Sequence, residues 1–186
     1  GSEMCIRDRV STYMKDLMKK TKPSHAYEAI KRNHAPGGMM SYESADDLKF
    51  YVKKGYCPGN AGKTLEWAFQ DWGLSRMALR MGKKSDAALY EKRSRAWTPL
   101  FNKNIGLILP KKENGEWLHT DPLNGQGWVE ANAWQATWSV SHDLPKLVEL
   151  MGGGDAFCEK LNYAFEQARP TDFVHAYSGG YVSYAN

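Results

Sequence analysis

Residues 128–152 read WVEANAWQATWSVSHDLPKLVELMG and place an acid, two amides and three indoles close together in sequence. A helix from about residue 129 to 138 would set Glu130, Trp134 and Trp138 on one face, because residues four apart are neighbours on a helix. Burial among indoles disfavours the charged form of a carboxyl group, so Glu130 is a candidate general acid. The alternative is structural, since a Glu in the first turn of a helix faces the positive end of the helix dipole.

The same stretch resembles the signature of glycoside hydrolase family 92. The matching segments are VEANAWQ at 129–135, Trp138, HDLP at 142–145 and LMGG at 150–153. Family members usually have EGNAWQY and HDVPGL here, so the chain departs from the pattern at Ala131, Ala136, Leu144 and Lys146. A second segment, KTLEWAFQDW at 63–72, is similar to the family's SKTLEYAYDDW.

The resemblance implies a fold and a function. Members of family 92 are calcium-dependent, inverting exo-α-mannosidases, which are extracellular or periplasmic enzymes that act on mannose-containing glycans. The implied fold class is mainly α, as part of an (α/α)6 toroid built from antiparallel helix pairs with a small β-hairpin. By this resemblance Glu130 is the general acid, and the residues expected to bind substrate are Asn132, Trp134, Gln135, His142 and Asn186.

Catalysis by inversion needs a second group, because the base that activates water is distinct from the acid. In the family the base and most calcium ligands come from segments beyond those matched here, so we expect no metal-ligating residue and no bound calcium in residues 1–186 themselves. Asn186 stands where α1,2-specific members tend to have His, which argues against that linkage. Asp143 is an alternative base, although an Asp before an apolar helical segment is more typical of a helix cap.

Several assignments stay open at the level of sequence. Asn132 and Gln135 either bond to sugar hydroxyls or hold the side chain of the acid in place. Trp134 and Trp138 are either core residues or a platform for a sugar. His142 matches a family position, but a lone His is more often structural than catalytic.

Composition excludes some other classes of protein. The formal net charge is +4, and the lysine pairs are scattered, so we expect no nucleic-acid partner. The three cysteines lie far apart and indicate neither a zinc site nor a disulfide framework. No apolar run approaches the roughly 20 residues that span a bilayer, so we expect no membrane segment. Residues 1–9 resemble a vector-derived or adapter-derived leader, which leaves 10–186 as a partial helical catalytic domain.

Apolar periodicity predicts a succession of helices with glycine or proline near many of their ends. A hairpin between residues 105–109 and 116–118 is expected around Asn114 and Gly115, a favoured turn pair. The competing interpretation is a helical domain that binds carbohydrate or protein without catalysis. A helical repeat is disfavoured because no period of 20–50 residues is present. The expected helices are 11–20, 24–35, 42–54, 64–81, 86–97, 129–138, 142–151 and 155–168.

Overall fold

The computed structural model describes residues 2–18, 22–38, 45–173 and 179–183, and the chain divides into two compact units. The first unit comprises residues 1–56 and 66–96, and the second comprises 57–65 and 97–186. The first unit is helical throughout its regular elements, which are α1 (Ser2–Met14), α2 (Pro23–Asn33), α3 (Ala45–Lys54), most of α4 (Ala61–Arg80) and α5 (Lys84–Arg93).

The ends of these helices follow local chemistry, with some shifts from the expected bounds. Helix α1 extends back to Ser2, so part of the expected leader is helical, and it ends at Met14. Helix α2 has Lys22 at its N-cap position and Pro23 in its first turn, so it begins one residue before the expected start at residue 24. Proline suits the first turn because it has no N–H that would need a partner and its φ is already helical. The expected end of α4 is confirmed within one residue, and Gly82 follows it with φ +74°.

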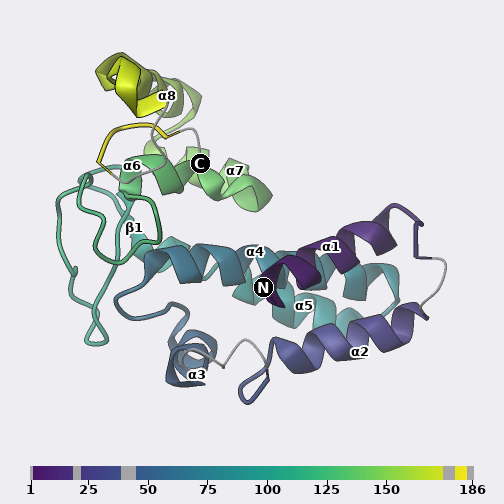
Figure 1. The fold of residues 1–186 in the computed structure, drawn as a ribbon. Coiled ribbons are helices and arrows are strands. Elements are labelled where there is room, and N and C mark those ends of the chain that lie inside the picture. The colour runs from purple at the N-terminus through teal and green to yellow at the C-terminus, as the bar shows by residue number, and fades with distance from the viewer. Residues whose placement is uncertain (1, 19–21, 39–44, 174–178, 184–186) are drawn as a thin grey trace. The chain divides into compact units, whose positions relative to one another are not determined.

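Helix α4 is buried on more than one side, as its apolar circumference predicts. Trp67, Ala68, Leu74, Met77 and Ala78 are all buried, whereas Leu79 at its end is exposed. In the same unit α1 packs on α2 (Figure 1). The core of the first unit is therefore arranged around α4.

A buried polar cluster lies within this core. The fully buried carboxylate of Asp71 accepts hydrogen bonds from the Tyr51 hydroxyl at 2.8 Å and from Arg93 Nε at 3.0 Å. His34 Nε2 lies 3.1 Å from the other carboxylate oxygen, but without the alignment of a hydrogen bond. Trp67 packs edge-on against both His34 and Tyr51. The Asp71 carboxylate thus connects three other parts of the unit: His34 directly after α2, Tyr51 within α3 and Arg93 at the end of α5.

The second unit contains the only strands among the described residues, and they form a two-stranded antiparallel sheet. Strand β1 (Phe101–Asn102) pairs with β2 (Leu107–Ile108), with Phe101 opposite Ile108. The expected pairing of 105–109 with 116–118 is therefore wrong, although Lys111 does form an isolated bridge with Trp117 around the Asn114–Gly115 turn. The reason is a tight turn after β1, in which Asn102 Oδ1 accepts the backbone N–H groups of Asn104 and Ile105.

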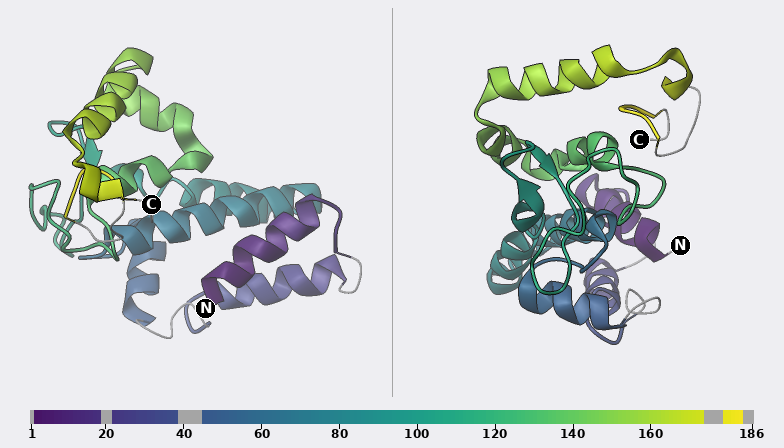
Figure 2. Two further views of the ribbon diagram at one scale, coloured as in Figure 1. Left: turned by 45° about the horizontal axis from the view of Figure 1, so that its top comes forward. Right: turned by 90° about the vertical axis from the view of Figure 1, so that its left-hand side faces the viewer.

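Short helical segments complete the second unit. Helices α7 and α8 follow each other, pack together and are separated at Gly152 and Gly153, both with positive φ (Figure 2). The hydrophobic core of this unit consists of Leu107, Leu109, Ala133, Trp134 and Ala164. The helical elements are η2 (Thr98–Leu100), α6 (Ala133–Ala136), η3 (Thr137–Ser139), η4 (Ser141–Asp143), α7 (Leu144–Met151), α8 (Gly154–Gln167) and η5 (Pro170–Phe173).

The mainly helical fold class with a small two-stranded sheet is confirmed. No helix within the described ranges has both the length and the apolar character needed to cross a membrane.

The Asp71 cluster predicts a specific loss of stability. Replacing Asp71 with Ala leaves the largely buried Arg93 guanidinium without its carboxylate partner, and we expect the free energy of unfolding to fall by about 3–5 kcal/mol. Urea unfolding monitored by circular dichroism measures this change. The matched control is Asp46→Ala, which removes a carboxylate that is 93% exposed and should cause no measurable change. Equal effects of the two substitutions would show that the buried cluster does not hold the first unit together.

Candidate active site

Glu130 does not lie on a helix. It occupies a bend with φ +51°, and its side chain is exposed. Helix α6 begins at Ala133, and its N-cap is Asn132. The backbone of Asn132 is extended (φ −140°, ψ −176°), so the helix does not continue back toward Glu130. The expected helix 129–138 is therefore wrong in its first four residues, and the expected burial of Glu130 among indoles is wrong as well.

The reason for this correction is local capping. Asn132 Oδ1 accepts the backbone N–H of Gln135 at 3.2 Å, which satisfies one of the N–H groups that a helix start leaves unpaired. Asn followed three residues later by Gln resembles the capping box that marks helix starts, so the sequence does contain the signal. A non-glycine residue in the left-handed region is uncommon, and such residues cluster at functional sites. The backbone of Glu130 is therefore strained just before α6 begins.

The two amides next to Glu130 face the protein interior. Asn132 is fully buried and Gln135 is 6% exposed. Asn132 Nδ2 donates to the carbonyl oxygen of Gly180 at 2.8 Å, and Gln135 Nε2 donates to the same oxygen at 3.0 Å. Gln135 Nε2 also lies 3.4 Å from the carbonyl oxygen of Val182. These contacts join the start of α6 to residues almost 50 positions later in the chain.

The two indoles have different surroundings. Trp134 is 7% exposed, and its ring centroid lies 5.5 Å from that of Tyr163 and 5.2 Å from that of Tyr181. Trp138 lies in η3 and meets Phe157 edge-on at 5.5 Å. Trp134 thus belongs to the core of the second unit, while its edge also lines a cleft.

The remaining expected residues lie around α7 or outside the described part of the chain. His142 and Asp143 form the end of η4, and Asp143 takes the N-cap position of α7 without a side-chain capping bond. The position agrees with the expected cap, but the bond does not form. Asn186 falls outside the described residues.

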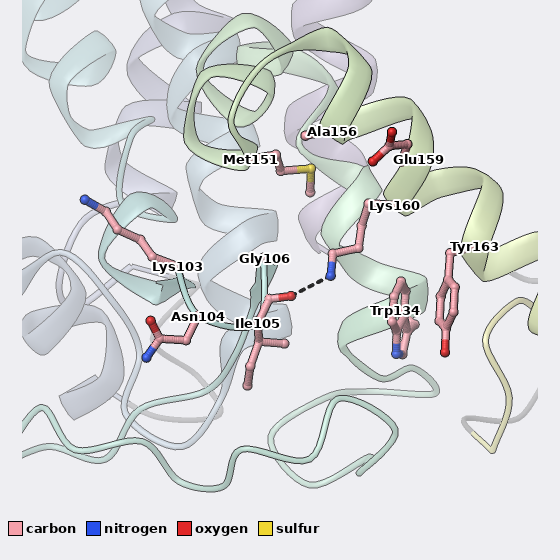
Figure 3. Close-up of a pocket in the computed structure, with 10 residues that line it drawn as sticks. All are labelled: Lys103, Asn104, Ile105, Gly106, Trp134, Met151, Ala156, Glu159, Lys160 and Tyr163. Carbon is pink, nitrogen blue, oxygen red and sulfur yellow. Dashed lines mark hydrogen bonds between the residues drawn. The ribbon is translucent and has the colours of Figure 1, made fainter.

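A cleft of about 570 Å³ lies on the second unit (Figure 3). Lys160 Nζ donates to the carbonyl oxygen of Ile105 at 2.7 Å and lies 5.3 Å from the centroid of the Trp134 ring. Partial burial lowers the pKa of the Lys160 ammonium group. Tyr163, which is 44% exposed, stands beside Trp134. Sequence reasoning missed Lys160 and Tyr163, whose only signal is their spacing of three on α8.

A calcium site does not emerge from the described side chains. No group of three or more His, Cys, Asp or Glu residues in the described ranges is arranged to hold a metal ion. The segment from Glu130 to Gln135 thus combines an exposed carboxyl group, a buried amide pair and Trp134, which packs against Tyr163 and Tyr181.

Comparison with known proteins identifies the family. The sequence model of the glycosyl hydrolase family 92 catalytic domain matches residues 8–186, and the chain belongs to this family. A curated relative is an uncharacterised secreted glycosidase of the fungus Arthroderma benhamiae, which is 25% identical over 191 aligned residues, covering 81% of this chain and 24% of the relative.

Solved structures support the same assignment. An inverting family 92 mannosidase from Bacteroides thetaiotaomicron is 27% identical, with a TM-score of 0.76 over 88% of this chain and 23% of that protein. A second α-mannosidase of the family from the same bacterium, solved with mannoimidazole, has a TM-score of 0.79 at 21% identity, over 95% of this chain and 25% of that protein, and shows the fold alone. The chain thus spans about a quarter of the length of these relatives.

The left-handed backbone at Glu130 generates a testable prediction. A side chain in this conformation costs about 1–2 kcal/mol, which glycine avoids, although glycine also gains freedom in the unfolded chain. We expect Glu130→Gly to raise the free energy of unfolding by up to about 1 kcal/mol in urea denaturation. Glu130→Ala is the matched control, because it removes the carboxyl group but keeps the Cβ atom. Equal stabilisation by both substitutions would contradict backbone strain as the cause.

Proposed function

We propose that the chain is the part of an inverting exo-α-mannosidase catalytic domain that carries the general acid, and that Glu130 is this acid. The enzyme would remove terminal mannose from glycans. The observation that carries the proposal is the exposed Glu130 carboxyl group on a strained backbone, directly before a helix whose start is fixed by buried amides. Family membership and the likeness to an inverting mannosidase support it.

The chemistry assigns Glu130 one half of the reaction. An inverting glycosidase protonates the leaving oxygen with one carboxyl group and activates water on the opposite face of the sugar with another, about 6.5–9.5 Å away. An exposed carboxyl group can reach the leaving oxygen of a bound glycan. We infer that the base and the calcium ligands belong to parts of the catalytic domain outside the quarter of the relatives' length that this chain spans.

The substrate and location follow from the same likeness. We infer a mannose-containing glycan, because two similar structures are mannosidases and one was solved with mannoimidazole. An extracellular location is supported by the secreted fungal relative.

A second candidate function is carbohydrate binding without catalysis. The cleft beside Trp134 favours it, since the half-exposed Tyr163 ring could stack on a sugar face while neighbouring polar groups bond to hydroxyls. This function would survive replacement of Glu130, whereas hydrolysis would not.

The activity prediction compares the 186-residue chain with the longer product of its gene. We expect no turnover of aryl α-mannosides by residues 1–186, with or without calcium, because general acid assistance alone provides only about 10²–10⁴-fold of the acceleration. In the longer product, Glu130→Gln should lower kcat by about 10²–10⁴-fold on substrates with poor leaving groups and far less on activated aryl mannosides, which need little protonation.

The control for this experiment is Glu166→Gln, which makes the same change at an exposed position on α8. It should leave both classes of substrate unaffected. Calcium-dependent hydrolysis by the 186-residue chain itself, abolished by Glu130→Gln, would show that the base lies within this chain. Asp143 would then be the first residue to replace.

A further inference from the structure

The side-chain amides of Asn132 and Gln135 converge on one carbonyl oxygen, that of Gly180, and we refer to these two residues as the amide clamp. We propose that the amide clamp is a positioning device: it holds the segment that carries Glu130 against residues 180–182, and it does not contact the sugar. The proposal rests on the proposed role of Glu130 as the general acid.

Burial of both side chains and the partners of their nitrogens argue against a sugar contact. Asn132 is fully buried and therefore out of reach of a ligand in the site. A glutamine amide has two N–H donors, and Gln135 directs them at the carbonyl oxygens of Gly180 and Val182, at 3.0 and 3.4 Å. A hydroxyl group could gain a hydrogen bond from Gln135 only by displacing one of these carbonyls. Both amide nitrogens are therefore committed to the backbone, and the Gln135 Oε1 atom, which has no hydrogen-bond partner among the described residues, is itself buried.

Gly180 is held from its other side as well. A Cβ atom at this position would lie 2.5 Å from the Asp172 carboxyl carbon, so only glycine allows this approach. The buried Asp172 carboxylate is itself fixed by the backbone N–H of Arg169 at 3.0 Å and by the Arg169 guanidinium at 2.8 and 3.1 Å. Gly180 is thus enclosed between the amide clamp and a carboxylate whose own orientation is set.

Helix α6 is fixed at its far end too. Thr137 Oγ1 donates to the carbonyl oxygen of Ala133 at 2.6 Å and accepts the backbone N–H of Ile108 at 3.1 Å, which ties the end of α6 to strand β2. At the start of the helix, the backbone N–H of Ala133 donates to the carbonyl oxygen of Pro122 at 3.1 Å. These contacts anchor α6 to strand β2 and to Pro122, and the clamp joins residues 180–182 to the first turn of this helix.

The clamp lies two residues from Glu130, with the buried Ala131 between them. Because Glu130 occupies a strained left-handed conformation, its geometry persists only while the surrounding structure holds it. Loss of the clamp should let both Glu130 and residues 180–182 relax. A displacement of about 1 Å can cost an enzyme roughly 100-fold in rate.

The first test measures local order in the 186-residue chain and needs no activity. Asn132→Asp keeps an acceptor for the helix cap but removes the donor to Gly180, and Gln135→Met removes the second donor at similar size without adding charge. Asn114→Asp is the matched control, because Asn114 is an exposed turn residue whose Oδ1 also accepts a backbone N–H. The measurement is amide hydrogen exchange, by mass spectrometry, of peptides that cover residues 179–183 and, for comparison, α8.

We expect exchange at 179–183 to accelerate about tenfold or more in both clamp variants, with α8 and the control unchanged. Unchanged exchange at 179–183 in both variants would overturn the clamp. Because Gln135→Met leaves the helix cap intact, it gives an answer even where Asn132→Asp does not fold.

The second test separates positioning from sugar binding, in the longer product of the gene. A mispositioned acid should lower kcat by about 10–100-fold on substrates with poor leaving groups, much less on activated aryl mannosides, and leave KM and inhibition by mannoimidazole unchanged. Equal losses on both substrates, or weaker binding of mannoimidazole, would overturn positioning in favour of a sugar contact. If Glu130→Gln itself shows no dependence on the leaving group, the proposed function fails while the exchange measurement still decides on the clamp.

Discussion

The carbonyl oxygen of Gly180 accepts hydrogen bonds from two buried side-chain amides, and the arrangement around Glu130 depends on this convergence. Asn132 performs two tasks at once, because its oxygen caps α6 while its nitrogen binds Gly180. Because Asn132 is the N-cap, α6 begins only at Ala133, and Glu130 stands before it on an exposed bend with a strained backbone. A buried polar group costs free energy unless it is paired. A structure in which the two amides are buried but do not reach the Gly180 carbonyl oxygen is therefore unfavourable. The same contacts that complete the fold of the second unit thereby present the carboxyl group.

The first unit is organised by a different constraint. There a single buried carboxylate, Asp71, gathers a tyrosine, a histidine and an arginine from several helices. Asp71 lies in the KTLEWAFQDW segment, which is similar to a family pattern, as is the segment around Glu130. In this structure Asp71 is buried with its polar partners, whereas the exposed Glu130 carries the proposed chemistry. Residues 63–72 and 129–135 both resemble family patterns, but their surroundings in the structure differ.

The sequence predicted the helical class and most helix ends, because glycine and proline act locally: Gly82 and Gly152 follow helices with positive φ, and Pro23 begins one. It also pointed to Glu130 and its neighbours, through resemblance. It did not predict the bend at Glu130, because helical spacing of Glu130, Trp134 and Trp138 outweighed the cap signal of Asn132 followed by Gln135. The clamp could not be predicted either, since its contacts join residues 45–48 positions apart and no local pattern records them. The sequence also did not predict that β1 pairs with β2. The Asn114–Gly115 pair is the stronger turn signal in the sequence, whereas the turn that joins these two strands is formed around Asn102.

Glu130 is proposed to serve as the acid of an inverting mannosidase whose base is a separate group. The most direct measurement follows the anomeric proton signals by NMR while a chain that includes a complete family 92 catalytic domain around these residues hydrolyses an α-mannoside. Inversion predicts that β-mannose forms first and that α-mannose appears later, only by mutarotation. Release of α-mannose as the first product would contradict the account, because it requires a carboxylate nucleophile and a covalent intermediate in place of an acid paired with a distant base.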